Sequence, residues 1–315
     1  MTTLLTIVVF ILGIVLILKG GDMLVSSAVA FANKFKIPPL LVGATIVAIA
    51  TTFPETTVSL IACSNGAVDI GLNTAVGAMV CNFTIVLGAS FLLFPTKVSA
   101  NSFLSKALFF IASVILLFIV SIDGKINYVE AGILLTNFII FIIFSGIEAS
   151  KHKNQDEFKP EPRSWLNIIA VFLVASLAIG LGAVALVNNV EPISKILHID
   201  SGIVGLVLVA VGTNIPELVT TITSVKLESP EIGIGNIFGA SIINSSMLLG
   251  LSVFASKNSH MPISKSLILI TVPILILITG IIVIPILKKQ QTKRYQGVLL
   301  MLLYFIYTYL VIKLT

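Results

Sequence analysis

The sequence predicts an all-α polytopic membrane protein, with ten transmembrane helices in two inverted five-helix repeats and broken helices at a central site. Three observations predict this fold: the composition, a succession of long apolar runs and a repeat at constant spacing. Hydrophobic residues form 57% and charged residues only 10% of the 315 residues, and the mean hydropathy is +1.11. A soluble domain carries about 25% charged residues, so this chain is not expected to cover a water-facing surface.

The few polar residues exclude several other classes of protein. The net charge of +5 comes from basic residues scattered through loops, as in membrane proteins, so no nucleic-acid partner is expected. The two cysteines and three histidines suggest neither a disulfide framework nor a thiolate or histidine metal centre. The apolar runs are continuous rather than alternating, which disfavours an outer-membrane barrel. We expect that the protein has no enzymatic activity and binds no cofactor.

A spanning helix needs about 20 mostly apolar residues, and ten runs meet this requirement. They are residues 3–31, 39–64, 70–95, 103–121, 127–147, 165–189, 202–226, 232–255, 264–287 and 295–313. No basic segment precedes the first run, which is therefore expected to be a retained helix rather than a signal peptide. The polar stretch 148–164 separates five runs from five. It predicts a first repeat at 1–147, a cytoplasmic linker and a second repeat at 165–315.

The basic residues predict the orientation in the membrane. Thirteen lysines and arginines, Lys106 among them, are assigned to loops after odd-numbered runs, and four to loops after even-numbered runs. Because positive residues concentrate on the cytoplasmic side, the odd-numbered loops are expected in the cytoplasm and both termini outside. The short linker suits the cell (plasma) membrane of a prokaryote.

A shift of 162 residues aligns the two halves of the chain without a gap. Gly43–Glu55 (GATIVAIATTFPE) and Gly205–Glu217 (GLVLVAVGTNIPE) share six of thirteen residues, and Gly71–Gly88 and Gly233–Gly250 share six of eighteen. The shared residues include Pro, Glu, Asn and Gly, which chance similarity between apolar helices would not match. Because five runs per repeat is an odd number, the second repeat enters the membrane upside down, as in secondary transporters.

Glu55 and Glu217 occupy equivalent positions near the middle of two spans. A lone charge there costs at least about 2.5–3.5 kcal/mol, so a symmetric pair indicates a functional site rather than packing. Pro54 and Pro216 precede them and are expected to break each span into two half-helices, because proline removes an intrahelical hydrogen bond. Irregular backbone at this depth survives only where it faces protein or a polar cavity.

Oxygen atoms around the two carboxylates are the candidate ligands of a cation. Freed carbonyls, threonine hydroxyls and asparagine amides on the same or the next spans supply them, although such asparagines also serve as interhelical hydrogen-bonding groups. The candidate ligands are Glu55, Glu217, Thr51, Thr213, Thr52, Asn214, Asn82, Asn244, Ala48 and Ala210.

The charge of the site selects the ion. Two carboxylates carry a charge of −2, which a divalent cation neutralises, and Ca²⁺ accepts about 6–8 oxygen ligands at flexible geometry. The lack of Cys or His beside the glutamates disfavours a soft transition metal, while manganese remains an alternative. A site at −2 should not cross a low-dielectric gate uncompensated. Monovalent cations or protons must therefore replace the divalent ion on the return step, which is antiport.

These residues resemble the cation/calcium exchanger superfamily, and most closely its prokaryotic sodium/calcium exchanger branch. That family carries two alpha-repeats, each with a Gly-Thr-Ser-x-Pro-Glu type core and a Gly-Asn-x-x-Gly-Ser-x-x-x-Asn or Asp type partner. The resemblance covers nearly the whole chain. It implies that Glu55 and Glu217 bind calcium with Thr51 and Thr213 beside them, and that the first and sixth spans slide past the rest in alternating access.

Two departures from the family pattern concern the counter-ion. The family's sodium-coordinating serine is replaced by Ala78 and Ala240, whose methyl groups offer no oxygen. The resemblance therefore implies exchange of Ca²⁺ for Na⁺, with Ca²⁺/H⁺ antiport as the alternative. A cation channel is a weaker alternative, because inverted repeats with an odd number of spans favour a carrier. The expected partners are the transported cations and the lipid bilayer, with no obligatory protein partner.

Overall fold

The computed structural model describes residues 3–66, 68–97, 100–152, 159–197, 214–256, 260–263 and 265–314. Within these ranges, nine helical segments are long and apolar enough to cross a membrane. This confirms the predicted polytopic helical fold. The seventh predicted run, 202–226, is described only from residue 214, so the count of ten helices stays a prediction.

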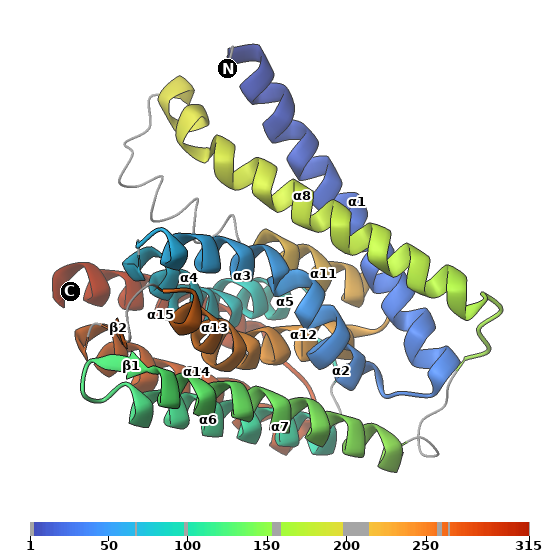
Figure 1. Ribbon diagram of the computed structural model, residues 1–315. Helices are drawn as coiled ribbons and strands as arrows, with labels where there is room; N and C mark the ends of the chain where they lie inside the picture. Colours follow the sequence, from blue (N-terminus) through green and yellow to red (C-terminus); the bar gives the residue numbers. More distant parts are fainter. Residues whose placement is uncertain are drawn as a thin grey trace.

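The helices of the two repeats follow the predicted runs closely (Figure 1). The first repeat contains α1 (Thr3–Phe35), α2 (Pro39–Val42), η1 (Gly43–Val47), α3 (Ala48–Ser64), α4 (Val68–Cys81), η2 (Asn82–Val86), α5 (Leu87–Leu93), α6 (Ala100–Val120) and α7 (Tyr128–His152). The second contains α8 (Trp165–Leu197), α11 (Ile215–Lys226), α12 (Pro230–Ile243), η4 (Asn244–Leu248), α13 (Leu249–Ala255), α14 (Lys265–Lys289) and α15 (Arg294–Leu314). The segments η1, η2 and η4 are single π-helical turns.

The expected break at Pro54 is wrong. Helix α3 continues through Pro54, and the departure from α-helical geometry lies earlier, in the π turn η1. A proline removes only one backbone hydrogen bond, and threonine hydroxyls reinforce the helix beside it. Thr52 donates to the carbonyl of Ala48 at 2.7 Å, and Thr56 donates to the carbonyl of Thr52 at 2.9 Å. In the second repeat, Pro216 lies in the first turn of α11 as predicted.

The two π turns η2 and η4 lie at equivalent positions of the repeats. They begin at Asn82 and Asn244, which are 162 residues apart. In each turn a hydroxyl group donates a hydrogen bond to the carbonyl four residues earlier. Thr84 donates to the carbonyl of Val80, and Ser246 donates to that of Ile242. Single π turns inside α-helices are frequent at functional sites.

Helices α1 and α8 show that the repeats are inverted. A Cβ atom added at Gly20 would lie 3.1 Å from the carbonyl oxygen of Ala175, and one added at Gly182 would lie 2.7 Å from that of Gly13. These two contacts are related by the 162-residue shift. Because the later residue on α1 meets the earlier one on α8, the helices cross in opposite directions along one side of the molecule (Figure 1).

The repeats also interlock through their last helices. On α5, a Cβ atom at Gly88 would lie 3.2 Å from the carbonyl oxygen of Gly297 on α15. On α13, a Cβ atom at Gly250 would lie 2.8 Å from Leu135 on α7, which is the equivalent contact. Each repeat therefore packs its final helix against the third span of the other repeat.

Short β pairings accompany this interlocking and are the one addition to the all-α prediction. Strand β1 (Lys125–Asn127) pairs antiparallel with β2 (His260–Pro262), and an isolated bridge joins Lys97 to Gln291. Both pairings connect a loop of one repeat to a loop of the other. They pair backbone N–H and C=O groups where the chain leaves its helices.

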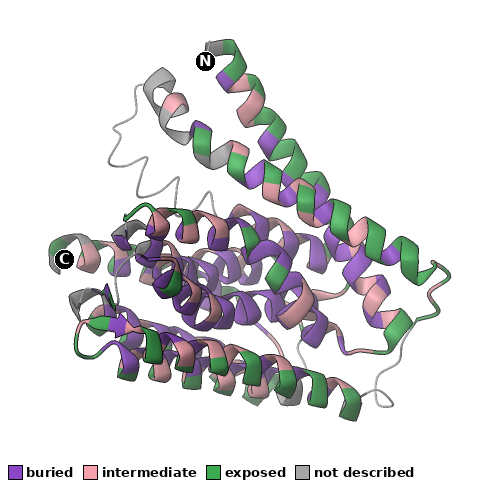
Figure 2. Ribbon diagram, in the orientation of Figure 1, coloured by how far each residue is buried: buried purple, intermediate pink, exposed green. Residues whose placement is uncertain are grey.

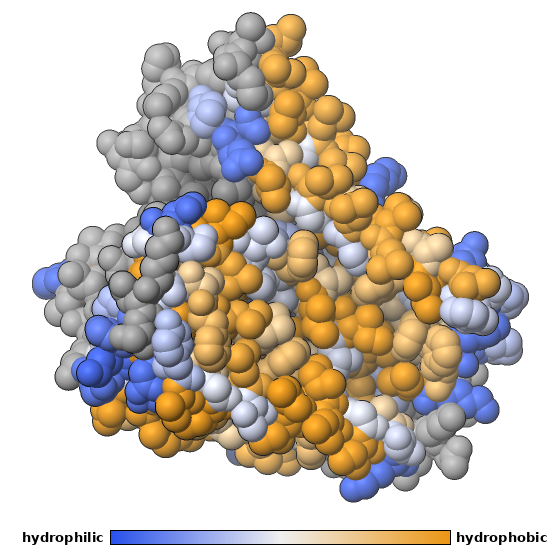
Figure 3. Space-filling view, in the orientation of Figure 1, coloured by the Kyte–Doolittle hydropathy of each residue, from blue (hydrophilic) through white to orange (hydrophobic). Residues whose placement is uncertain are grey.

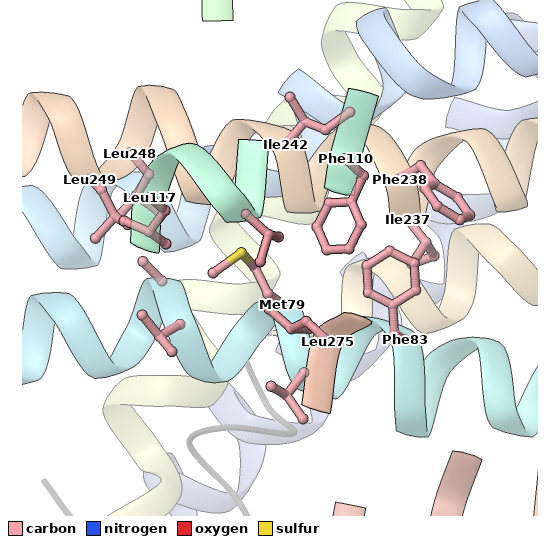
Figure 4. Packing of buried hydrophobic residues seen from close by; sticks show 14 of the residues in the cluster. Met79, Phe83, Phe110, Leu117, Ile237, Phe238, Ile242, Leu248, Leu249 and Leu275 are labelled. Atoms are coloured by element: carbon pink, nitrogen blue, oxygen red, sulfur yellow. The ribbon is translucent and has the colours of Figure 1, made fainter. Parts of the chain in front are cut away.

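The core lies between the repeats, while the outer helices present apolar side chains outward. Phe83 of η2 packs against Phe110 and Phe238 with ring centroids 4.6 and 4.9 Å apart (Figure 4). The central helices are largely buried, whereas α1 and α8 expose much of their length (Figure 2). The outward face is predominantly hydrophobic (Figure 3), as expected for contact with lipid.

Lys106 was predicted to lie in a loop and Glu148 in the linker. Instead, the two side chains form an ion pair between two helices. Lys106 lies inside α6 and Glu148 inside α7, a helix that continues past the predicted end of the first repeat at residue 147 to His152. Lys106 is fully buried, and its Nζ lies 2.7 Å from Glu148 Oε2. Ser105 donates to Glu148 Oε1 at 2.7 Å. The pairing explains how both charges can lie within membrane-spanning helices.

Candidate functional site

Glu55 lies on α3 in the buried centre of the protein. Its side chain has no solvent exposure, and Asn244 Nδ2 donates to its Oε2 at 3.2 Å. This bond joins the repeats, because Asn244 begins the π turn η4 of the second repeat. The close approach of η1 and α12 helps to bring these elements together, since any Cβ atom at Gly239 would clash with the carbonyl of Ala44.

Glu217 lies in the first turn of α11 and is also fully buried. Helix α12 packs against both α3, which carries Glu55, and α11, which carries Glu217, so it joins the two glutamate-bearing helices. Among the described residues, neither oxygen of Glu217 has a hydrogen-bond partner that meets ordinary distance and angle limits, and Oε1 of Glu55 has none. The two carboxylates therefore present three oxygen atoms without a donor in the part of the chain that is described.

Thr51 and Thr52, which precede Glu55, are buried, and their hydroxyl groups donate hydrogen bonds to nearby carbonyl and amide oxygens. Thr51 donates to Asn236 Oδ1 at 3.0 Å and approaches the carbonyl of Ala48 at 3.3 Å. Thr52 donates to the same carbonyl at 2.7 Å. The Ala48 carbonyl is thus a hydrogen-bond acceptor in this conformation, whereas the lone pairs of Thr51 remain available as ligands.

The remaining candidates divide into three groups. Asn82 is buried, and neither atom of its amide has a hydrogen-bond partner among the described residues; on the same basis, Asn244 Oδ1 is unpaired. Asn214 is buried immediately before α11. Thr213 and Ala210 lie outside the described residues.

The unpaired atoms suit a cation. Buried polar groups in proteins are almost always hydrogen-bonded, so a cluster of unpaired ones calls for a specific explanation. Among the described residues, the unpaired buried atoms include carboxylate and amide oxygens, which are hard ligands typical of Ca²⁺ sites, and the hydroxyls of Thr221 and Ser241. A bound cation would satisfy several of them at once.

Two residues of the central network were not predicted. Asn236 lies on α12 and Thr220 on α11; both are fully buried, and Asn236 Nδ2 donates to Thr220 Oγ1 at 3.1 Å. The repeat comparison aligns Asn236 with Thr74, so it is absent from the shared residues. The signal that could have found it is the Gly235-Asn236 pair itself, which matches the Gly-Asn start of the partner motif.

The positions of the two missing serines are apolar. Ala78 and Ala240 are buried, and Ala240 belongs to a small hydrophobic cluster with Ala48 and Ile243. Phe138 and Met247 pack against this cluster. The hydroxyl oxygen that the family pattern supplies next to the centre is therefore replaced by hydrocarbon on this side.

Comparison with known proteins gives a consistent set of similarities. The profile of the family described as sodium/calcium exchanger protein matches residues 5–147 and 167–313, one segment for each repeat. The chain is 26% identical to the sodium/calcium exchanger MaX1 of Methanosarcina acetivorans, over 94% of this chain and 95% of that protein. It is also 26% identical to the putative antiporter CaxA of Alkalimonas amylolytica, over 96% and 97%.

Solved structures show the same architecture. The sodium-calcium exchanger NCX_Mj, soaked with 100 mM Na⁺ and 10 mM Sr²⁺, superposes with a TM-score of 0.84 at 25% identity. The match covers 98% of this chain and 99% of that chain. The structure soaked with 10 mM Na⁺ and no Ca²⁺ gives a TM-score of 0.83 over the same shares.

Proposed function

Because the chain belongs to the sodium/calcium exchanger protein family, we propose that it is a secondary antiporter that exchanges Ca²⁺ for Na⁺ at the Glu55/Glu217 site. The observation that carries the proposal is the pair of buried carboxylates, three of whose oxygens have no donor in the described part of the chain. Two carboxylates neutralise one divalent cation, and the surrounding amide and hydroxyl oxygens fit the ligand preference of Ca²⁺.

The inverted repeats support a carrier that alternates between two sides of the membrane. Helices α1 and α8 cross on one side of the core (Figure 1), and in this proposal they shift relative to it during transport. The proposed setting is the cell membrane of a prokaryote, which the short linker suits, with both termini outside, as the distribution of basic residues indicates. We propose that residues 1–147 form the first repeat and residues 165–315 the second. Transport is proposed to require neither a cofactor nor a protein partner.

The counter-ion is tested by flux measurements on purified protein in proteoliposomes. We expect uptake of calcium-45 when the vesicles contain Na⁺ and the outside does not, at equal pH on both sides. Uptake driven only by an acid interior, without Na⁺, would contradict sodium coupling and support proton exchange. Uptake with neither gradient would contradict a carrier and indicate a channel. Protein-free vesicles give the leak.

A Ca²⁺/H⁺ antiporter is the second candidate, and the apolar surroundings of Ala240 favour it. A sodium ion needs several oxygen ligands, whereas a proton needs only one carboxylate. Loss of a hydroxyl at both symmetric positions weakens Na⁺ binding without weakening protonation of Glu55 or Glu217. The divalent site is the same in both candidates.

Restoring the two serines should strengthen sodium coupling. The double substitution Ala78→Ser and Ala240→Ser is expected to lower the Na⁺ concentration for half-maximal Ca²⁺ exchange about tenfold. A hydroxyl oxygen that contacts a buried charge contributes roughly 1.5 kcal/mol, which corresponds to this factor. The matched control is Ala78→Cys with Ala240→Cys, because sulfur has similar size but is a poor ligand for a hard cation. Equal effects of serine and cysteine would contradict a role of these positions in Na⁺ binding.

A further inference from the structure

We infer that Asn236 is a positioning residue that orients the Thr51 hydroxyl so that its lone pairs face the cation. The inference rests on the proposed function, because it concerns the same site. Asn236 contacts neither carboxylate by a hydrogen bond in the structure. It acts instead through a chain of three fully buried side chains on α3, α12 and α11.

The donor and acceptor of each hydrogen bond in this chain are determined by Thr220 on α11. The Thr220 hydroxyl lies 2.8 Å from the carbonyl of Pro216 and 3.0 Å from that of Glu217, and a carbonyl can only accept. The single proton of Thr220 is therefore used by the first turn of α11. What Thr220 offers to Asn236, 3.1 Å away, is a lone pair.

This fixes the orientation of the Asn236 amide. Its NH₂ group must face Thr220, because Thr220 has no proton left to donate to an amide oxygen. The amide oxygen then faces Thr51, 3.0 Å away, and accepts the Thr51 proton. A reversed amide would set its oxygen against the Thr220 hydroxyl oxygen, which is two acceptors with no proton between them.

The consequence at the site is that Thr51 is an acceptor toward the centre. Its proton lies on the far side, toward Asn236 Oδ1 or the Ala48 carbonyl, so its remaining lone pairs are free. A hydroxyl that was free to rotate could instead donate to a nearby carboxylate and would then compete with a cation. The chain Glu217 carbonyl, Thr220, Asn236, Thr51 therefore links the helix turn that holds one glutamate to a ligand next to the other.

The arrangement is present in one repeat only. The positions equivalent to Asn236 and Thr220 are Thr74 and Val58. Threonine has no amide and valine has no polar group, so the first repeat cannot build the same chain. The ligand side chains of the two repeats are therefore oriented by different hydrogen bonds, although Glu55 and Glu217 occupy equivalent positions.

The first test is a double-substitution cycle on Ca²⁺ binding to the purified full-length protein in detergent, measured by isothermal titration with CaCl₂. Asn236→Leu and Thr51→Val are each expected to weaken the Kd for Ca²⁺ about 10–100-fold, the range found when a group that orients a metal ligand is removed. The double variant should be no weaker than about the worse single variant, because Asn236 acts through Thr51. Thr74→Val, at the equivalent position of the first repeat, is the control and should change the Kd less than about threefold.

The second test keeps the inference falsifiable if Asn236→Leu does not fold. Thr220→Val removes the acceptor that fixes the amide and should weaken Ca²⁺ binding about tenfold, while Thr220→Ser keeps the hydroxyl and should restore it. Equal binding by the valine and serine variants, or additive losses in the cycle, would overturn the positioning role alone. A wild-type protein that bound no Ca²⁺ would overturn the proposed function together with it.

Discussion

Glu217→Gln is expected to reduce Ca²⁺ transport by more than about 100-fold, because removing an outer group that merely orients a ligand already costs about 10–100-fold in metal affinity. The substitution removes one of the two charges that neutralise the divalent ion. It also replaces one of the two Glu217 oxygens, which have no donor among the described residues, by an NH₂ group that cannot bind a cation. Glu55→Gln should have a similar effect on transport, although its remaining carbonyl can still accept the bond from Asn244.

Thermal unfolding with and without Ca²⁺ distinguishes a loss of ion binding from a loss of folding in the Glu217→Gln protein. The cation-free Glu217→Gln protein should be at least as thermostable as the wild type, because the substitution removes a buried charge. Added Ca²⁺ should then raise the melting temperature of the wild type and not that of the variant. Glu130→Gln, which removes a carboxylate at the start of α7, is the matched control. Normal calcium-45 flux through the Glu217→Gln protein would remove the central claim.

Breaking the buried ion pair between α6 and α7 should have the largest effect on stability. Lys106→Met leaves Glu148 without its cation, and the expected loss is about 3–5 kcal/mol in the free energy of unfolding. Lys106 is fully buried, and its Nζ also lies 3.2 Å from Ser145 Oγ and 5.2 Å from the centroid of the Phe144 ring. Thermal unfolding of the detergent-solubilised protein measures the loss.

The double variant Lys106→Met with Glu148→Leu distinguishes the pair from ordinary packing. Replacing both partners by apolar groups of similar volume is often neutral, so the double variant should recover most of the stability lost in the single one. Lys151→Met, an exposed lysine one turn after Glu148, is the control and should change stability little. A double variant as unstable as the single variant would contradict the assignment of the loss to an unpaired charge.

Much of the fold could be predicted because membranes impose long apolar runs, and because the two halves still share a constant offset. The glutamates stood out for the same reason: a charge in the middle of an apolar run is rare. Their burial and their unpaired oxygens required the structure. The roles of individual ligands stay predictions, and Thr213 and Ala210 lie outside the described residues.

The features that could not be predicted depend on pairs of residues far apart in the chain. Lys106 and Glu148 were assigned to a loop and a linker because each charge was judged alone, yet together they are compatible with the membrane. The π turns at Asn82 and Asn244 have no known local sequence signature, and the break expected at Pro54 assumed that its neighbours would not compensate. Asn236 has no equivalent in the first repeat, so a search for shared residues passes over it.

The interlocking of the last helices bears on the ancestry of the chain. Gly88 packs against α15 and Gly250 against α7, so each half covers a glycine surface on the third span of the other half. A gene that encoded one half alone would therefore yield a complete core only when two copies inserted in opposite directions and assembled as a dimer. Duplication and fusion would then allow the halves to diverge, and the Lys106–Glu148 pair and the Asn236 chain are two such one-sided acquisitions.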